Sequence, residues 1–232
     1  MPLLLLDLDN TLIDRAAAFR RWAVSFTAEC AIRNGAEPTP GADVKWLIDA
    51  DRDGLEPRDR LAASIQQRFG LEDRQQREIL AELRGGLVEN IELDPEVPAA
   101  LDRARAAGWI PVVVTNGTVA QQERKLRHTG LAEHVAGWVI SEGAGIRKPD
   151  PLIFRLAADQ TGQSLAGAWV IGDSAEADIG GARNAGLPSV WLHRNRAWPH
   201  PDFAPTLTKD TCPQAITAIM THVPAHLTEP GA

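Results

Sequence analysis

The chain has 232 residues, of which 44% are hydrophobic and 24% are charged, and its formal net charge is −7. This length is enough to bury a full hydrophobic core, either in one medium domain or in a domain with an inserted module. The acidic balance argues against a general nucleic-acid binder, because phosphate backbones recruit basic surfaces.

The first predicted element is the apolar run Leu3–Leu6, which stops at Asp7. Such a run is typical of a strand that is buried on both faces, as in parallel sheets. It is too short for the core of a signal peptide, and no stretch approaches the ~20 apolar residues of a membrane span. We expect Cys30 and Cys212 to be separate reduced thiols. These features predict a cytoplasmic protein without a membrane partner.

A long helical stretch follows the first strand, with no convincing strand of its own. Spaced apolar positions predict helices at 15–33, 43–50, 58–69 and 73–88, with glycine and proline breaks at 35–40, 54–57 and 70. An all-helical insertion at this place is suited to form a lid over the site that the first strand builds. We predict an α/β core domain of residues 1–14 and 91–232, and a helical cap domain of residues 15–90.

Strands and helices alternate in the rest of the chain. Further apolar runs predict strands at 109–115, 137–141, 168–172 and 189–192. Helices are predicted at 95–107, 118–129, 151–161, 175–185 and 213–221. Asp150 is the expected N-cap of the helix that Pro151 opens. This alternation predicts an α/β fold: an open, mostly parallel Rossmann-like sheet flanked by helices, with the helical cap inserted after the first strand.

Polar residues gather in four clusters near the ends of predicted strands. Ligands of open α/β sheets bind outside the carboxyl ends of the strands, so we expect these clusters to converge. The first cluster is Asp7-Leu8-Asp9-Asn10-Thr11. Its paired carboxylates need a cation, and Mg²⁺ prefers such hard oxygen ligands together with a substrate phosphate. An acidic loop that caps the next helix is the alternative interpretation.

The second and third clusters offer groups that bind anions. Thr115-Asn116-Gly117 combines a hydroxyl, a backbone N–H and a glycine that permits close approach to phosphate, although Asn-Gly is also a common turn. Lys148 stands before the helix that Pro151 opens, where it could neutralise a phosphoryl group and the attacking carboxylate. A solvated surface lysine is the alternative there.

The fourth cluster runs from Gly172-Asp173 to Asp178. Asp173, at a predicted strand end, is placed to ligate a metal. Asp178 lies in the first turn of the following helix, where a charge favourable to the helix dipole would also explain it.

Together the four clusters resemble the motifs of the haloacid dehalogenase superfamily, in its phosphatase branch. That family has a DxDxT motif, a Ser or Thr after the second hydrophobic strand, a Lys before a helix, and an acidic GDxxxxD-like motif. The clusters occur here in the same order and cover the chain from residue 1 to about 195. The resemblance implies a Mg²⁺-dependent hydrolase of a small phosphorylated metabolite, with a cap that excludes water and selects the substrate.

The resemblance also implies a role for each motif residue. Asp7 would attack phosphorus to form an aspartyl-phosphate, and Asp9 would act as general acid and then as general base. Mg²⁺ would be held by the Asp7 carboxylate, the Asp9 main-chain carbonyl and Asp173. The phosphoryl oxygens would be held by Thr115, Asn116, Gly117 and Lys148. Asp178 and Thr11 would support these groups from behind, Asp178 by orienting Lys148 or a metal-bound water.

Other activities remain open at this stage. Dehalogenases use the same nucleophile, but a halide leaves without a proton, so the acid at Asp9 favours phosphoryl transfer. Phosphotransfer or mutase chemistry would pass the aspartyl-phosphate to an alcohol. Phosphonate cleavage would need a cap lysine such as Lys45, which a snorkelling surface role explains better. A catalytically silent phosphate-binding or partner-binding module is the alternative from another class, disfavoured because Asp7, Asp9, Lys148 and Asp173 are all present.

The predicted cap contains an acidic segment, Asp49-Ala50-Asp51-Arg52-Asp53-Gly54, that copies the opening of a calcium loop. Such a loop needs a glutamate at its twelfth position, where this chain has Arg60, so we do not assign calcium to it. Arg52 and Arg58 could contact a second anionic group of the substrate, or be solvated charges. The substrate itself is not specified, and the sequence is compatible with a monomer or a homodimer.

Overall fold

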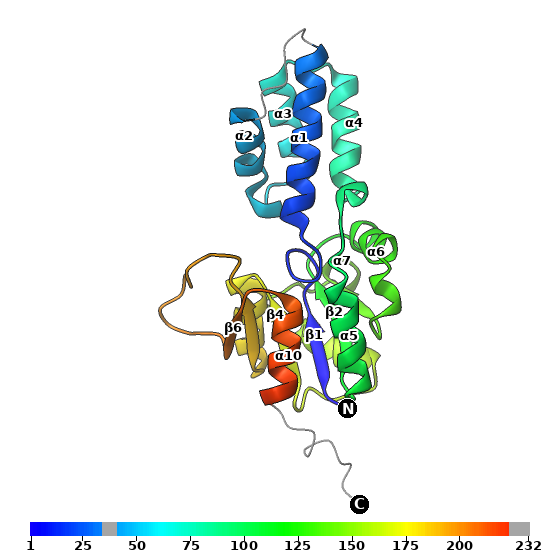
Figure 1. Cartoon of the computed structure of the whole chain (residues 1–232), viewed down its shortest axis with the longest axis vertical. Helices are drawn as coiled ribbons and strands as arrows, with labels where there is room; N and C mark the ends of the chain where they lie inside the picture. Colours follow the sequence, from blue (N-terminus) through cyan, green and yellow to red (C-terminus); the bar gives the residue numbers. More distant parts are fainter. Residues whose placement is uncertain (34–40, 223–232) are drawn as a thin grey trace, which may run out of the picture. The chain divides into compact units, whose positions relative to one another are not determined.

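The computed structural model describes residues 1–33 and 41–222 of the chain (Figure 1). The chain divides into two units: Met1–Ile13 with the chain from Leu93 onward, and Asp14–Glu92. The predicted break at 35–40 lies outside the described residues, as do residues 223–232 of the predicted core domain.

The first unit is built on a six-stranded parallel sheet in the order β3-β2-β1-β4-β5-β6. The strands are β1 (Leu3–Leu6), β2 (Ile110–Thr115), β3 (Trp138–Ile140), β4 (Trp169–Gly172), β5 (Ser189–Leu192) and β6 (Leu207–Lys209). The leucine run forms β1, which lies in the middle of the sheet between β2 and β4. The predicted open parallel α/β sheet is therefore confirmed.

Helices cover both faces of this sheet. They are α5 (Glu96–Ala106), α6 (Val119–His128), α7 (Ser141–Ala144), α8 (Leu152–Gln160), α9 (Gly181–Ala185) and α10 (Cys212–His222). Leu3 and Leu5 pack in one core cluster with Phe154 of α8. Because successive side chains of a strand point to opposite faces, the buried Leu4 and Leu6 face the other side. On that side α5 and α10 contact the sheet and each other.

Some predicted boundaries of the first unit are wrong. The edge strand β6 was not predicted, because it is short and its Thr208 and Lys209 give no apolar run. Helix α8 begins at Leu152, one residue later than expected, and the Asp150 carboxylate accepts the Leu152 N–H at 2.9 Å. The helix expected over 175–185 is a wide π-helical turn, Ala175–Gly180, followed by the short α9.

The second unit consists of helices. They are α1 (Arg15–Arg33), α2 (Ala42–Asp51), α3 (Arg58–Phe69) and α4 (Asp73–Arg84), with short 3₁₀ turns at Arg52–Gly54 and Val88–Asn90. Their apolar faces share one core, in which the Trp22 and Phe26 rings stack with centroids 5.1 Å apart. Helix α4 is shorter than the expected 73–88, because Gly86 and Leu87 take positive φ angles and end the helical path.

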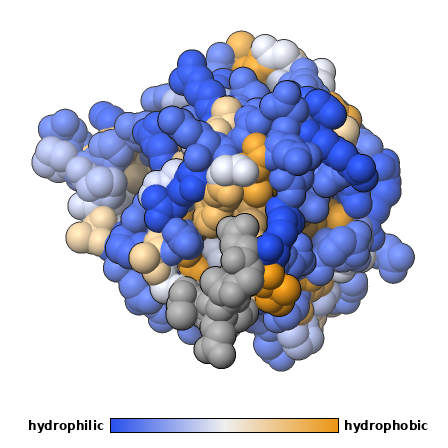
Figure 2. Space-filling view, turned by 90° about the horizontal axis from the view of Figure 1, so that it is seen from above, coloured by the Kyte–Doolittle hydropathy of each residue, from blue (hydrophilic) through white to orange (hydrophobic). Residues whose placement is uncertain are grey.

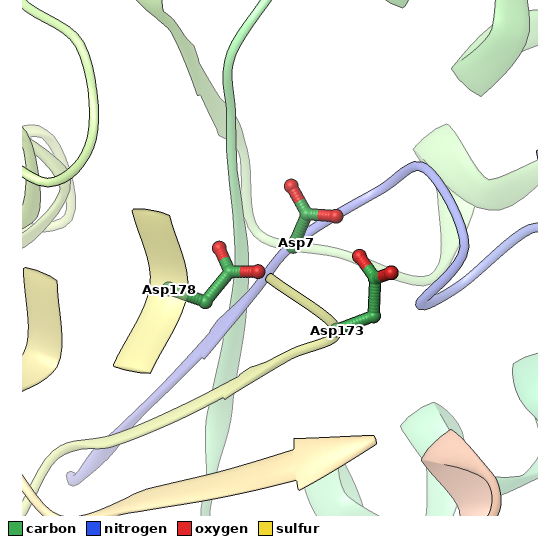
Figure 3. A group of neighbouring side chains, drawn as sticks. All are labelled: Asp7, Asp173 and Asp178. Atoms are coloured by element: carbon green, nitrogen blue, oxygen red, sulfur yellow. The ribbon is translucent and has the colours of Figure 1, made fainter. Parts of the chain in front are cut away.

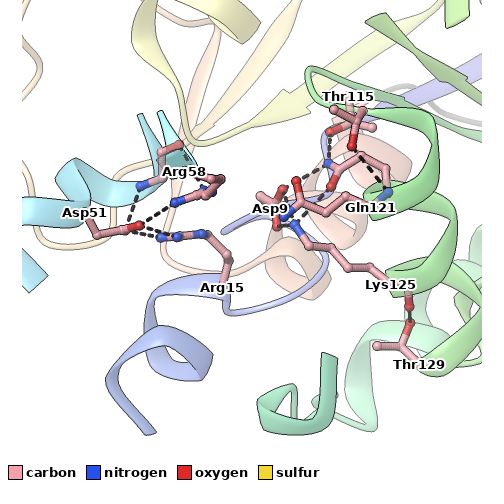
Figure 4. Close-up of polar contacts among 11 residues, drawn as sticks. Asp9, Arg15, Asp51, Arg58, Thr115, Gln121, Lys125 and Thr129 are labelled. Atoms are coloured by element: carbon pink, nitrogen blue, oxygen red, sulfur yellow. Dashed lines mark hydrogen bonds and ion pairs between the residues drawn. The ribbon is translucent and has the colours of Figure 1, made fainter. Parts of the chain in front are cut away.

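The buried polar centre of the second unit is Asp51, which is 2% exposed. Its carboxylate pairs with the guanidinium groups of Arg15 and Arg58 and accepts the Gly54 N–H at 2.8 Å (Figure 4). Asp51 is the central carboxylate of the acidic segment that resembles a calcium loop. In the structure this carboxylate is bound by two arginine side chains and a backbone N–H. Arg58 also donates to the Gly54 carbonyl, whereas the Arg52 side chain is 66% exposed and lies 3.6 Å from Glu56.

No helix within residues 1–33 and 41–222 combines the length and the apolar character needed to cross a membrane. The face of the molecule seen in Figure 2 is mostly hydrophilic, with hydrophobic residues scattered among polar ones.

Replacing Asp51 with Ala should lower the free energy of unfolding by about 3–5 kcal/mol, because two largely buried guanidinium groups would lose the carboxylate that pairs with both. Asp49→Ala is the matched control, since Asp49 lies on the same helix, is 61% exposed and pairs across one turn with the exposed Lys45. That control should shift stability by no more than about 0.5 kcal/mol. Urea denaturation of the two variants measures the difference, and equal shifts would contradict this account of Asp51.

Candidate active site

The carboxyl ends of three adjacent strands bring the candidate site together. Asp7 directly follows β1, Thr115 ends the neighbouring β2, and Asp173 directly follows β4 on the other side. Lys148 comes from the segment before α8. Parallel strands end at the same edge of a sheet, so residues more than 100 positions apart meet there. Figure 3 shows Asp7, Asp173 and Asp178 with their carboxylates turned toward one another.

The Lys148 ammonium group lies at the centre of this cluster, and the residue is only 3% exposed. Its Nζ donates to Asp7 Oδ1, to Asp178 Oδ1 and to the Val114 carbonyl, each at 2.6 Å. Burial favours the neutral amine, but the two carboxylates outweigh it and hold the pKa of Lys148 above its ordinary value. Lys148 is therefore a fixed positive charge against Asp7.

Three carboxylates lie close together at this site, two of them paired with Lys148. One oxygen each from Asp7, Asp173 and Asp178 lies within 4.8 Å of the other two. Burial, followed by repulsion from Asp178 and Asp173, raises the pKa of Asp7 to about 8, against the attraction of Lys148. Burial and Asp178 likewise raise the pKa of Asp173 to about 6. An additional cation would relieve this repulsion, and a set of hard oxygen donors suits Mg²⁺.

The wide helical turn after β4 places Asp178 in the cluster. The Ser174 carbonyl accepts the N–H groups of both Asp178 and Ile179, at 3.0 and 3.2 Å, and the Ser174 N–H donates to Asp178 Oδ2 at 2.9 Å. Asp178 is thereby buried to 1% exposure and bonded to Lys148, in place of a solvated position at the helix start. Gly172 makes this possible, because a Cβ there would lie 2.2 Å from the Asp178 carboxyl group.

The three residues of the second cluster, Thr115, Asn116 and Gly117, each contact a different part of the chain. Asn116 bonds with its side chain to the main chain of Lys148, accepting from the N–H at 2.9 Å and donating to the carbonyl at 3.0 Å. It therefore fixes the segment that carries the lysine. The Gly117 N–H donates to Ser141 Oγ at 3.0 Å. The buried Thr115 hydroxyl accepts from Gln122 at 2.8 Å.

Asp9 is held apart from the three-carboxylate group. Its two oxygens lie 2.7 and 2.8 Å from Lys125 Nζ, and Gln122 donates to its Oδ2 at 3.0 Å. The loop folds back tightly, because the Leu8 carbonyl accepts N–H groups from Thr11 and the two residues after it. The Thr11 hydroxyl is buried and has no hydrogen-bond partner among the described residues.

Sequence reasoning missed two pairs of basic or polar residues at the site. One pair is Gln122 and Lys125, whose only signal is their i, i+3 spacing on the helix that follows Thr115. The other pair is Arg194 and Arg196, just after β5. They lie 2.9 and 3.0 Å from Asp173 Oδ2, and Arg196 also donates to the Asp173 carbonyl at 2.6 Å. The sequence signal that could have identified these two arginines is their position just after β5, the strand next to β4.

Gly172→Ala should lower the free energy of unfolding by about 1–3 kcal/mol, because the added methyl overlaps the Asp178 carboxylate. It should also move Asp178 away from Lys148. The control is Gly137→Ala, where an added Cβ meets nothing within 4 Å and stability should stay the same or rise slightly. Thermal denaturation of both variants checks this expectation, which fails if Gly172→Ala is as stable as Gly137→Ala.

The chain is similar in sequence to a known family of hydrolases. The family model of haloacid dehalogenase-like hydrolases matches residues 1–186. Phosphoserine phosphatase of Thermus thermophilus is 39% identical over 115 residues, which are 50% of this chain and 46% of that protein. Pyrimidine 5'-nucleotidase YjjG of Escherichia coli is 39% identical over 97 residues, 41% of this chain and 43% of that protein. The matches therefore span less than half the length of these relatives.

Solved structures match over nearly the whole chain. The HAD-hydrolase YfnB of Bacillus subtilis, bound to magnesium, has a TM-score of 0.72 at 23% identity, covering 94% of this chain and 98% of that one. This likeness shows the fold. A 2-haloacid dehalogenase of Pseudomonas syringae has a TM-score of 0.60 at 26% identity, covering 96% of this chain and 99% of that one.

Proposed function

The chain belongs to the haloacid dehalogenase-like hydrolases, and from this premise we propose that it is a Mg²⁺-dependent phosphatase of a small phosphorylated metabolite. The observation that carries the proposal is the buried contact between Lys148 Nζ and Asp7 Oδ1, beside two further carboxylates. A carboxylate fixed against a buried cation at the edge of a parallel sheet is suited to meet an anionic substrate.

In this proposal Asp7 is the nucleophile. One of its oxygens forms a bond to phosphorus while the ester P–O bond breaks, which gives an aspartyl-phosphate and releases the alcohol. The charge of Lys148 stabilises the phosphoryl oxygens during the transfer. The hydroxyl of Thr115 and the backbone N–H of Asn116 would hold the same oxygens. Asp178 acts by orienting Lys148, with which it shares a 2.6 Å contact.

Asp9 is the proposed general acid and base. It gives a proton to the leaving oxygen in the first step, and takes one from the water that hydrolyses the aspartyl-phosphate in the second. The carboxylates of Asp7 and Asp173 and the main-chain carbonyl of Asp9 would hold the metal. Mg²⁺ bound there would offset the repulsion among the carboxylates and the charge of the phosphoryl group.

Dehalogenase activity is the second candidate, favoured by the likeness to the Pseudomonas syringae dehalogenase. That reaction does not need Asp9 as a general acid, because a halide departs unprotonated. We therefore place it second, and hydrolysis of 2-haloacids in the same assay series distinguishes the two activities. Transfer of the phosphoryl group to an alcohol would appear as a phosphorylated product in place of inorganic phosphate.

The first test is release of inorganic phosphate from a panel of metabolites in the presence of Mg²⁺. The two relatives described above suggest that the panel should contain phosphoserine and pyrimidine nucleoside monophosphates. Asp7→Asn should lower kcat by about 10⁴-fold or more, as expected for removal of a covalent nucleophile. EDTA should abolish turnover and added Mg²⁺ should restore it. Asp49→Asn serves as the control on an exposed carboxylate, and wild-type turnover by Asp7→Asn would contradict the proposal.

Asp9→Asn should slow kcat by about 10²–10⁴-fold, the usual contribution of general acid–base catalysis. The effect on kcat/KM should depend on the leaving group. The value of kcat/KM should fall more for an alkyl phosphate than for 4-nitrophenyl phosphate, whose leaving group needs no protonation. Steady-state kinetics with the two esters measures this difference, and an equal loss of kcat/KM for both would exclude Asp9 as the acid.

A further inference from the structure

We propose that Lys125 is a positioning residue that, together with Gln122, sets the orientation of the Asp9 carboxylate. The inference rests on the proposed function, because it assigns to α6 the control of the acid–base group. Figure 4 shows Lys125 extending from α6 to Asp9. Nζ lies within 2.8 Å of both Asp9 oxygens, so the contact fixes the direction of the carboxylate as well as its distance.

The burial of Lys125 indicates that its contact with Asp9 is part of the folded interior and not a chance surface ion pair. The residue is 3% exposed, although lysine is almost never buried without a partner. The Asp9 side chain is 26% exposed, so it is open to solvent on one side and held by a buried cation on the other. A carboxylate in that position can be reached by substrate and water while its rotamer stays fixed.

Gln122 joins this contact to the end of β2. Its Nε2 donates to both Asp9 Oδ2 and Thr115 Oγ1, at 3.0 and 2.8 Å, and its Oε1 accepts from Lys125 at 2.9 Å. All the polar atoms of this side chain, which is 1% exposed, are thus used in orienting site residues. Gly117 leaves the space for it, since a Cβ there would lie 3.0 Å from Gln122 Cγ and Cδ.

The consequence concerns the rate of the chemical step. A general acid must point at the leaving oxygen when the P–O bond breaks, and a freely rotating carboxylate would have to be ordered at that moment. Lys125 and Gln122 supply that order beforehand. Because Asp9 acts in bond breaking, loss of Lys125 should appear in kcat with KM little changed.

The first variants are Lys125→Met, which keeps the chain length and removes the charge, and Lys125→Arg, which keeps the charge. Lys125→Met should lower kcat by about 10–100-fold, the size of loss found when residues that orient metal-ligating side chains are replaced. Lys125→Arg should recover a substantial part of this loss. Arg127→Met is the control, because Arg127 lies on the same helix and its side chain is 63% exposed. Denaturation curves of all three check that each is folded.

The decisive measurement is a double-mutant cycle with Asp9→Asn. If Lys125 acts through Asp9, then Lys125→Met should slow the Asp9→Asn enzyme less than twofold. A general structural role would instead slow both backgrounds by the same factor, which would overturn this inference while leaving the phosphatase proposal standing. A wild-type enzyme without turnover of any phosphate ester would overturn the proposed function, and this inference with it.

Discussion

The contact of Lys148 with Asp7 and Asp178 is the interaction on which the site depends. Burying a charged side chain is unfavourable unless it is paired, and here one ammonium group is bound by two carboxylates and a carbonyl. In return, the lysine allows carboxylates from β1 and from the turn after β4 to lie close together. Asn116 secures the main chain of the lysine, and Gly172 provides the space for Asp178.

The end of β2 serves two polar networks through consecutive residues. Thr115 belongs to the network of α6, in which Gln122 and Lys125 hold Asp9. Asn116, the next residue, belongs to the network of Lys148 and the nucleophile candidate Asp7. The last residue of β2 and the residue after it thus support two carboxylates with different proposed roles, which are paired with separate cations. A shift of β2 would disturb both networks together.

The sheet and the convergence of the acidic clusters could be predicted from the sequence, because continuous apolar runs mark buried parallel strands and such strands end at one edge. The strand Leu207–Lys209 could not, since it is short and lies at the edge of the sheet. Contacts between distant residues leave no local pattern. The segment around Asp51 copies the opening of a calcium loop, and its local sequence could not reveal the partner Arg15, which lies 36 positions away. The link from Lys125 to Asp9 likewise spans 116 positions.

The environment of Asp51 has a consequence for how this chain can diversify. Arg15, Arg58 and Gly54, the groups that bind the carboxylate, all belong to Asp14–Glu92, as does the aromatic core around Trp22. The Asp14–Glu92 unit thus contains the partners of its buried carboxylate as well as its own hydrophobic core. Surface residues of this unit can therefore be exchanged, during evolution or by an engineer, while its buried ion pairs and its aromatic core stay intact.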